Sequence, residues 1–279
     1  MSDFKNKNVL ITGAASGIGK MMAEKAAALG ANLFLWDLNP SGLDSVRLSL
    51  QQNGNNVHTY VVDLSDRAAI YDTAAQVLND GGAIDILINN AGIVSGKPLL
   101  EISDEQIQRT FDVNTLALFW TTRAFLPRMI KQGRGHIVTI ASAGGIVGTS
   151  KLVDYSASKF AAIGFDDALR MEFKRMKLPI QTTVVCPFYI DTGMFEGVKT
   201  RFPFLLPILK PEYAVRRIMN AIQKNRRRLV MPRFVLTAYP MRIFPMAIFD
   251  AVNGFFGINK TMDEFKGRTQ SKVKEGAPV

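Results

Sequence analysis

The first 190 residues alternate short apolar runs with longer segments in which apolar residues recur every three or four positions. Short runs rich in β-branched residues are typical of strands buried on both faces of a parallel sheet, and the longer pattern is typical of amphipathic helices. The runs predict strands at 8–12, 32–36, 57–62, 84–89, 136–140 and 181–186. The segments between them predict helices at 17–29, 42–52, 67–78, 104–130 and 153–176. This order predicts an α/β fold built from βαβ units around a doubly wound parallel sheet.

The pattern is less regular after residue 198. An apolar loop or short helix is expected at 199–210, a helix opened by Pro211 at 211–224 and a last strand at 229–231. Three prolines at 232, 240 and 245 then exclude one long helix. We therefore separate residues 1–228 from a C-terminal extension at 229–279.

Charge divides the chain at nearly the same place. The 279 residues carry a formal net charge of +10. Residues 1–198 hold 18 basic and 19 acidic side chains, whereas residues 199–279 hold 16 basic and 5 acidic ones. The extension also contains many aromatic residues and no recognisable nucleic-acid-reading helix, so a nucleic-acid partner is not expected.

Composition also limits the compartment and the metal chemistry. A lone cysteine, Cys186, cannot form an internal disulfide, and two distant histidines give almost no zinc ligand set, so we expect no metal. Residues 1–7 are polar and no apolar window of about 18 residues occurs, which predicts neither a signal peptide nor a spanning helix. We expect a cytoplasmic protein that is not secreted, with peripheral contact at a membrane surface as an option.

A glycine-rich turn follows the first predicted strand. Gly13, Gly17 and Gly19 stand between that strand and the first helix, in the segment Thr-Gly-Ala-Ala-Ser-Gly-Ile-Gly. Glycines let the backbone approach a pyrophosphate, and a helix N-terminus offers free N–H groups to it. A structural glycine turn is the alternative interpretation of this motif taken alone.

An acidic residue at the end of the second strand strengthens the dinucleotide interpretation. Asp37 lies 18 residues after Gly19, where a carboxylate can accept hydrogen bonds from a ribose diol. Its charge would repel a ribose 2′-phosphate, and this favours NAD over NADP. Asp63 with Leu64, and Asn90 with its neighbours, follow the next two strands and are expected to line the same cleft.

Tyr155 and Lys159 are four residues apart in a predicted helix and therefore share one face. A neighbouring cation lowers a phenol pKa, which would let a tyrosine accept and donate protons. A surface pair is the common alternative for this spacing.

The order and spacing of four motifs resemble the short-chain dehydrogenase/reductase family. The motifs are the glycine turn, the Asn-Asn-Ala-Gly segment at 89–92, Ser142 and the Tyr155/Lys159 pair. The resemblance covers about residues 6–225 and implies a single Rossmann-type domain with strand order 3-2-1-4-5-6-7 and a nicotinamide cofactor. It implies that Tyr155 is the general acid/base, that Lys159 holds the nicotinamide ribose and lowers the Tyr155 pKa, and that Ser142 binds the reacting oxygen. Asn114 matches the family residue that anchors a water next to Lys159.

Together the motifs and the resemblance predict a set of cofactor contacts. The expected residues are Gly13, Ser16, Gly17, Ile18, Gly19, Asp37, Asp63, Leu64, Asn90, Ala91, Gly92, Tyr155, Lys159, Pro187, Ile190 and Thr192. The chain departs from the family pattern after the sixth strand, where Phe188 replaces the usual glycine. This aromatic ring is expected to narrow the space beside the nicotinamide, or simply to pack in the loop.

Segments at 34–38, 119–127 and 135–142 resemble the branch that contains 17-beta-hydroxysteroid and retinol dehydrogenases. That resemblance implies a retinoid, steroid or long-chain lipid alcohol as substrate, and an apolar lid at about 190–225 agrees with it. A helix pair packed on the core is the alternative for this lid. For the extension we keep three interpretations open: a membrane-surface contact, a dimer or tetramer contact, and packing within the chain.

The sequence thus predicts an NAD-dependent oxidoreductase for a hydrophobic alcohol/carbonyl pair, acting through Asn114, Ser142, Tyr155 and Lys159 and forming a homo-oligomer. The alternatives are a non-catalytic dinucleotide-binding or membrane-docking protein, or the same chemistry on a small carbonyl.

Overall fold

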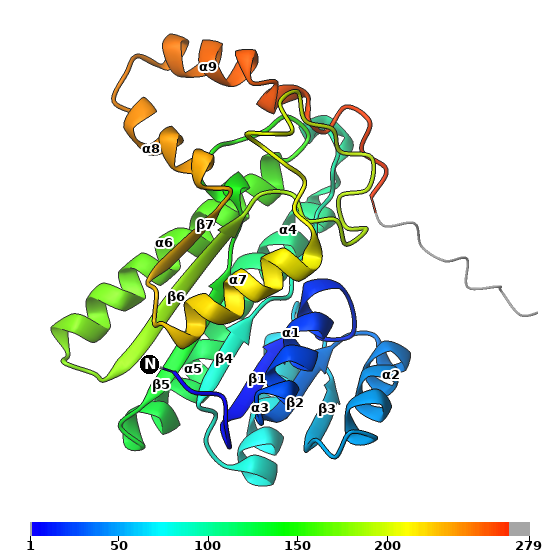
Figure 1. The fold of residues 1–279 in the computed structure, drawn as a ribbon, viewed down its shortest axis with the longest axis vertical. Helices are drawn as coiled ribbons and strands as arrows, with labels where there is room; N and C mark the ends of the chain where they lie inside the picture. Colours follow the sequence, from blue (N-terminus) through cyan, green and yellow to red (C-terminus); the bar gives the residue numbers. More distant parts are fainter. Residues whose placement is uncertain (1, 268–279) are drawn as a thin grey trace, which may run out of the picture.

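Seven parallel strands form one sheet in a computed structural model that describes residues 2–267 (Figure 1). The strand order is β3-β2-β1-β4-β5-β6-β7. The strands are β1 Asn8–Thr12, β2 Asn32–Asp37, β3 Val57–Val61, β4 Ile86–Asn89, β5 Gly135–Ile140, β6 Ile180–Pro187 and β7 Arg228–Met231. Every predicted strand is present with bounds that differ by at most two residues, and the predicted doubly wound order is confirmed.

Helices cover both faces of this sheet. They are α1 Gly17–Ala28, α2 Pro40–Gln51, α3 Arg67–Gly81, α4 Asp104–Phe111, α5 Ala117–Lys131, α6 Val153–Arg175, α7 Pro211–Gln223, α8 Ala238–Met241 and α9 Met246–Phe255. The shorter turns are η1 Leu99–Glu101, η2 Asp112–Leu116, η3 Ala143–Gly145, η4 Arg233–Thr237 and η5 Ile258–Lys260. Among residues 2–267 no helix is both long enough and apolar enough to cross a bilayer.

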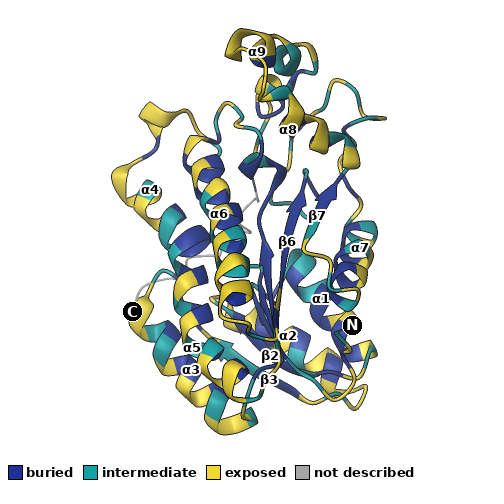
Figure 2. Ribbon diagram, turned by 90° about the vertical axis from the view of Figure 1, so that its left-hand side faces the viewer, coloured by how far each residue is buried: buried dark blue, intermediate teal, exposed yellow. Residues whose placement is uncertain are grey.

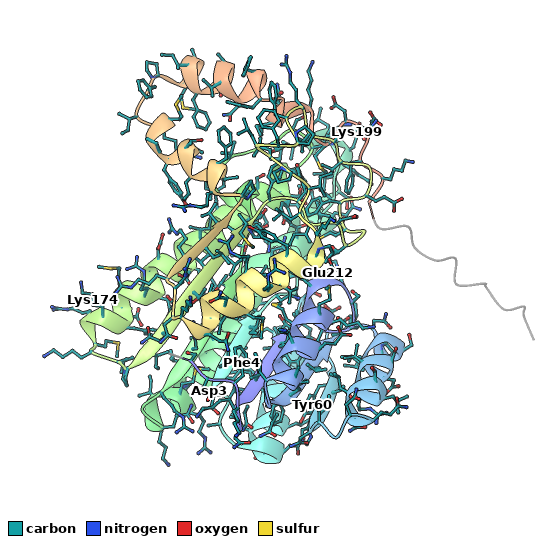
Figure 3. The ribbon with its side chains drawn as sticks, in the orientation of Figure 1. Asp3, Phe4, Tyr60, Lys174, Lys199 and Glu212 are labelled. Atoms are coloured by element: carbon teal, nitrogen blue, oxygen red, sulfur yellow. The ribbon has the colours of Figure 1, made fainter. Side chains whose placement is uncertain are left out.

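Alternating side chains of the central strands divide the core into two layers. Val9 and Leu33 pack with α1, α2 and α7 on one face, whereas Leu10 and Phe34 pack with α3, α5 and α6 on the other. Phe4, ahead of β1, is fully buried in the first layer (Figure 3). Because both faces are covered, the near-continuous apolar sequence of the strands is explained.

The helix predicted at 104–130 runs from Asp104 to Lys131, but it is not α-helical throughout. A π-helical turn, η2, separates α4 from α5 in this segment. The apolar pattern continues through the turn, so it gives no sign of the extra residue that the wider turn inserts. The turn carries Asn114, whose side-chain contacts are described below.

The C-terminal third agrees in part with the lid and extension that the sequence suggests, since Thr192, Phe195 and Leu206 line a cleft. Residues 191–210 form neither a helix nor a strand, so they contain no helix pair. Helix α7 packs on α1 and the core through Ile218 and Ile222 and does not cover the cleft. Strand β7 pairs with β6, so the expected boundary at residue 228 falls inside the sheet.

Candidate active site

The glycine turn lies where β1 enters α1. Gly13 and Gly17 have φ values of +67° and +56°, which favour glycine. A Cβ atom on Gly19 would lie 2.0 Å from the carbonyl oxygen of Gly13, so no larger residue fits there without backbone movement. The N-terminus of α1 therefore meets the cleft at a turn with little side-chain bulk, which fits the phosphates of a dinucleotide.

Thr12 fastens this turn to the end of β4. Its buried hydroxyl oxygen accepts hydrogen bonds from the backbone N–H groups of Asn90, at 2.9 Å, and Ala91, at 3.0 Å. The Asn90 side chain donates to the carbonyl oxygen of Thr12 at 2.9 Å. The 89–92 segment thus lines the cleft, as predicted, and also holds the glycine turn in place.

Two carboxylates line the same cleft, and one of them is bonded to the glycine turn. Asp37 accepts hydrogen bonds from the N–H groups of Ala15 and Asn39, one on each oxygen, so lone pairs remain for a ligand. Asp63 accepts from Ser65 and forms an ion pair with Arg109 at 3.3 Å. Burial opposes ionisation of Asp63, but these partners outweigh it and hold the pKa of its carboxyl below the ordinary value.

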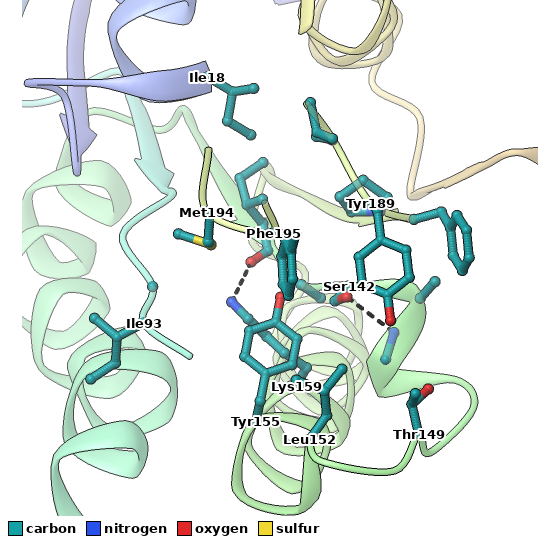
Figure 4. Close-up of a pocket in the computed structure, with 18 of the residues that line it drawn as sticks. Ile18, Ile93, Ser142, Thr149, Leu152, Tyr155, Lys159, Tyr189, Met194 and Phe195 are labelled. Carbon is teal, nitrogen blue, oxygen red and sulfur yellow. Dashed lines mark hydrogen bonds between the residues drawn. The ribbon is translucent and has the colours of Figure 1, made fainter. Parts of the chain in front are cut away.

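The predicted chemical groups meet at the carboxyl end of β5 (Figure 4). Tyr155 and Lys159 come from α6, and the Lys159 ammonium lies 5.7 Å from the centre of the Tyr155 ring. Lys159 Nζ donates to the carbonyl oxygen of Ile140 at 3.0 Å, and Ser142 Oγ accepts from the N–H of Gly144 at 3.0 Å. The helix places the phenol and the ammonium on one side, as their spacing predicts.

Burial dominates the protonation of both groups. It raises the pKa of the Tyr155 phenol to about 12, although a hydrogen bond with Ser142 opposes the rise. It lowers the pKa of the Lys159 ammonium to about 8. Desolvation of the phenolate thus acts against the lowered Tyr155 pKa that the family resemblance implies.

Asn114 lies behind the cleft and is not among its lining residues. It is 1% exposed, and its amide donates to the Ile93 carbonyl at 2.9 Å and to Ser158 Oγ at 3.0 Å while accepting from the Ile93 N–H at 2.9 Å. The π-helical turn thereby pins the segment after β4 to α6. Every other predicted catalytic or cofactor residue lines the cleft.

Aromatic rings close the cleft beside Tyr155. The Phe195 ring packs edge-on against Tyr155 with centres 5.7 Å apart, and Tyr189 packs against Phe195 at 5.0 Å. Phe188 contacts Tyr189 at 4.6 Å and also lines the cleft, as expected for an aromatic residue in place of glycine. Tyr189 OH and Thr261 Oγ1 are 2.9 Å apart in a buried hydrogen bond.

The C-terminal segment supplies the other wall, which the sequence did not assign to the site. Its lining residues are mainly apolar: Phe234, Val235, Thr237, Ala238, Met241, Phe249, Val252, Asn253, Phe256 and Ile258. Their irregular spacing among prolines gave no periodic signal. Their apolar and aromatic composition was the only indication of a role.

Asp154 is a second residue that sequence reasoning missed. Its carboxylate is 3% exposed and accepts from Ser95 Oγ at 2.7 Å and from Thr110 Oγ1 at 2.9 Å. Asp154 precedes Tyr155 in the first turn of α6, so it ties the start of that helix to α4 and to the segment after β4. An acidic residue at this position resembles an ordinary helix N-terminal acid, which hides its role.

Comparison with known proteins agrees with this geometry. The family model described as short chain dehydrogenase matches residues 7–201. Human epidermal retinol dehydrogenase 2 is 44% identical over 92% of this chain and 84% of its own, and human estradiol 17-beta-dehydrogenase 11 is 44% identical over 80% and 74%. A crystal structure of a short chain dehydrogenase/reductase from Burkholderia phymatum in complex with NAD superposes with a TM-score of 0.78 at 27% identity, covering 86% of this chain and 94% of that one.

Proposed function

Because the chain belongs to the short-chain dehydrogenase/reductase family, we propose that it transfers a hydride between a nicotinamide cofactor and a retinoid, steroid or long-chain lipid alcohol or its carbonyl product. The observation that carries this proposal is the convergence of Tyr155, Ser142 and Lys159 in one cleft. A glycine turn bounds this cleft at one end and apolar side chains bound it at the other.

The residues present fit a dinucleotide. The Gly13–Gly19 turn and the N-terminus of α1 would hold the phosphates, because Gly19 leaves no room for a side chain and the helix end carries partial positive charge. Asp37 would accept hydrogen bonds from the adenosine ribose. We propose NAD over NADP because the Asp37 carboxylate would repel a 2′-phosphate.

The cofactor, when bound, supplies the hydride acceptor or donor. In alcohol oxidation, Tyr155 Oη accepts the hydroxyl proton, and in carbonyl reduction it returns that proton to the oxygen. Ser142 Oγ donates a hydrogen bond to the same oxygen, where negative charge develops. Lys159 places its positive charge beside the phenol and so favours the phenolate that oxidation requires.

The lining of the cleft selects the substrate class. Phe188, Phe195 and Phe256 line the cleft, and Phe195 packs on Tyr155, so a sugar would find few hydrogen-bond partners there. The printed names of two relatives, a retinol dehydrogenase and an estradiol dehydrogenase, agree with an apolar alcohol.

We also propose that the protein forms a homo-oligomer through the outer surface of α5 and α6. Phe119, Phe160 and Met171 are exposed there, and Phe119 packs against Phe165 with ring centres 4.7 Å apart. Light scattering on the purified protein would test this proposal, and a monomer at all concentrations would contradict it.

The proposed reaction is tested with retinol, steroid alcohols, long-chain alcohols and a small ketone, each assayed with NAD(H) and with NADP(H). Tyr155→Phe should lower turnover roughly 10²–10⁴-fold and change NADH binding much less than turnover. Asp37→Ser should raise the use of NADP relative to NAD roughly tenfold. Unchanged turnover in Tyr155→Phe would contradict the mechanism, and NADH binding without turnover of any compound would indicate a non-catalytic dinucleotide-binding protein.

A further inference from the structure

Two buried polar residues lie next to the chemical groups on α6, which runs between α4 and β6 (Figure 2). Asp154 directly precedes Tyr155, and Ser158 directly precedes Lys159. Asp154 is 3% exposed, Ser158 is 0% exposed, and neither is among the residues that line the cleft. Residues four apart share one face of a helix, so Asp154 and Ser158 form a face beside the one that carries Tyr155 and Lys159. Contacts that hold the first face therefore fix the rotation of the second.

The π-helical turn η2 holds Ser158. Asn114 donates to Ser158 Oγ at 3.0 Å, and Thr115 Oγ1 donates to the Ser158 carbonyl at 3.1 Å. Ser158 Oγ in turn donates to the Tyr155 carbonyl at 2.7 Å. The turn of α6 that carries Lys159 is therefore fixed by hydrogen bonds from a neighbouring element.

Asp154 holds the preceding turn, where Tyr155 lies. Its Oδ1 accepts a hydrogen bond from Ser95 Oγ at 2.7 Å, and its Oδ2 accepts one from Thr110 Oγ1 at 2.9 Å. Leu152 stands at the N-cap of α6 and makes no capping hydrogen bond with its side chain. The Asp154 carboxylate thus attaches a helix start that lacks a side-chain cap to two other parts of the fold.

Ser95 belongs to the segment that forms one wall of the cleft. Gly92 and Ile93 of this segment line the cleft. A Cβ atom on Gly92 would lie 3.3 Å from Lys159 Nζ, so the segment runs close to α6. The bond between Asp154 and Ser95 therefore sets how the first turn of α6 meets this wall.

The hydrogen-bond pattern separates the geometry of this contact from its charge. The Thr110 hydroxyl has one proton and two acceptors at 2.9 Å, the Gln106 carbonyl and Asp154 Oδ2. An asparagine at 154 could accept from Ser95 through its oxygen and donate to Thr110 Oγ1 through its amide. The Thr110 proton would then go to Gln106, so Asp154→Asn keeps both contacts and removes only the charge.

We propose that Asp154 is a positioning residue for the reaction. Through Ser95 and Thr110 it fixes the first turn of α6 and so holds Tyr155 Oη within hydrogen-bond reach of the substrate oxygen. Proton transfer needs this short distance, and a displacement of about 1 Å can slow a reaction about 10²-fold. The inference rests on the proposed function, because that function makes Tyr155 the proton acceptor and donor.

Substitution of Asp154 separates positioning of Tyr155 from cofactor binding. Asp154→Ala should lower kcat roughly 10²-fold with an alcohol that the wild type oxidises. The KM for that alcohol and the Kd for NADH should change much less, because the Lys159 turn is held separately. Asp154→Asn should restore most of the lost turnover. Steady-state rates and fluorescence titration with NADH measure these values.

Asp85→Ala is the matched control for loss of a buried carboxylate. Asp85 is 9% exposed and accepts hydrogen bonds from the Asn8 N–H at 3.1 Å and from Arg134 at 2.8 Å. It precedes β4, at the edge of the sheet opposite the cleft. Its removal should lower the free energy of unfolding but leave kcat close to the wild-type value at temperatures well below unfolding.

Ser95→Ala tests the same contact from its other partner. It should lower kcat roughly tenfold, and adding it to Asp154→Ala should cause no further loss, because both changes remove one shared hydrogen bond. It also serves as the second variant if Asp154→Ala does not fold.

Three results would overturn the proposal. They are an unchanged kcat in folded Asp154→Ala, an equal loss in Asp154→Asn, which would assign the effect to charge, and an equal loss in Asp85→Ala, which would assign it to stability. If the wild type turns over none of the compounds, amide hydrogen exchange is the deciding measurement. Faster exchange at 153–157 in Asp154→Ala than in Asp154→Asn would then support the contact and contradict only the proposed function.

Discussion

Tyr155 and Lys159 are both buried, and burial moves their pKa values toward the neutral forms. Alcohol oxidation needs the Tyr155 phenolate, and its population rises tenfold per pH unit below the phenol pKa. We therefore expect the oxidation rate to rise from pH 7 with a slope near one and to rise less steeply above about pH 8, where Lys159 loses its charge. Carbonyl reduction uses the protonated phenol and should not rise.

Steady-state rates in both directions between pH 6 and 10 check this expectation. A falling oxidation rate between pH 7 and 8, or identical profiles for the two directions, would show that another group limits proton transfer.

His136 gives a separate pH effect on stability. It is buried between Ser2 Oγ, at 2.9 Å, and Thr183 Oγ1, at 2.8 Å, and burial lowers its pKa to about 4. An unfolded histidine titrates near 6.5, so the unfolded chain binds more protons between about pH 4 and 6.5. The free energy of unfolding should therefore fall on acidification through this window, by about 3 kcal/mol in total.

Urea denaturation at several pH values measures this dependence. In His136→Gln the slope within the window should shrink by the contribution of one group, even though the variant starts from lower stability. Parallel curves for the two proteins would rule out His136 as the source.

At the scale of single residues, sequence motifs predicted which side chains lie together, but they did not predict how deeply those side chains are buried. Spacing on a helix was enough to bring Tyr155 and Lys159 together. Burial decides their pKa values, however, and burial depends on Phe195 and Tyr189, which arrive from a loop without periodic pattern.

One buried hydroxyl, that of Thr12, joins the end of β1 to the segment that follows β4. Thr12→Val keeps the shape of the side chain but leaves the N–H groups of Asn90 and Ala91 without their acceptor. We expect it to lower the free energy of unfolding by about 1–3 kcal/mol and to weaken NADH binding.

Thr139→Val is the matched control in β5. The Thr139 hydroxyl is buried and has no hydrogen-bond partner among the described residues, so its removal should be neutral or stabilising. Chemical denaturation of both variants tests the pair, and equal destabilisation would contradict the role assigned to Thr12.

Helices and strands whose apolar residues recur at a regular spacing were predicted closely. Elements whose conformation depends on side-chain hydrogen bonds were not. Strand β1 has the predicted bounds because its buried positions carry apolar residues, and this apolar run is visible in the sequence. The π-helical turn inside 104–130 was missed because the Asn114 contacts with Ile93 and Ser158 join segments far apart in the sequence. No local pattern contains that information.

At the scale of the whole molecule, Arg242 fastens the α8–α9 segment to the body. Its guanidinium lies 5.2 Å from the Phe160 ring centre and 5.6 Å from that of Phe249, and it donates to the Ile146 carbonyl at 2.6 Å. It thus joins the C-terminal wall of the cleft to the segment that follows Ser142. Arg242→Met should speed hydrogen exchange in residues 238–255 roughly tenfold and raise KM for long apolar alcohols more than it changes kcat.

Arg233→Met makes the same change of charge nearby and should leave both measurements close to the wild type, since Arg233 is exposed and does not stack on either ring. Exchange rates that rise equally in both variants would attribute the effect to charge alone.

Strand β7 makes the basic C-terminal third inseparable from the chemistry. The Phe188 N–H donates to the Met231 carbonyl at 2.7 Å, so the last strand holds backbone that lines the cleft. A chain cut after Asn225 would expose β6 as a free edge, which invites aggregation, and would release that backbone as well. Changes to the C-terminal segment that are meant to leave the cleft intact must therefore keep β7, and the outward side chains of α8 and α9 offer places for them.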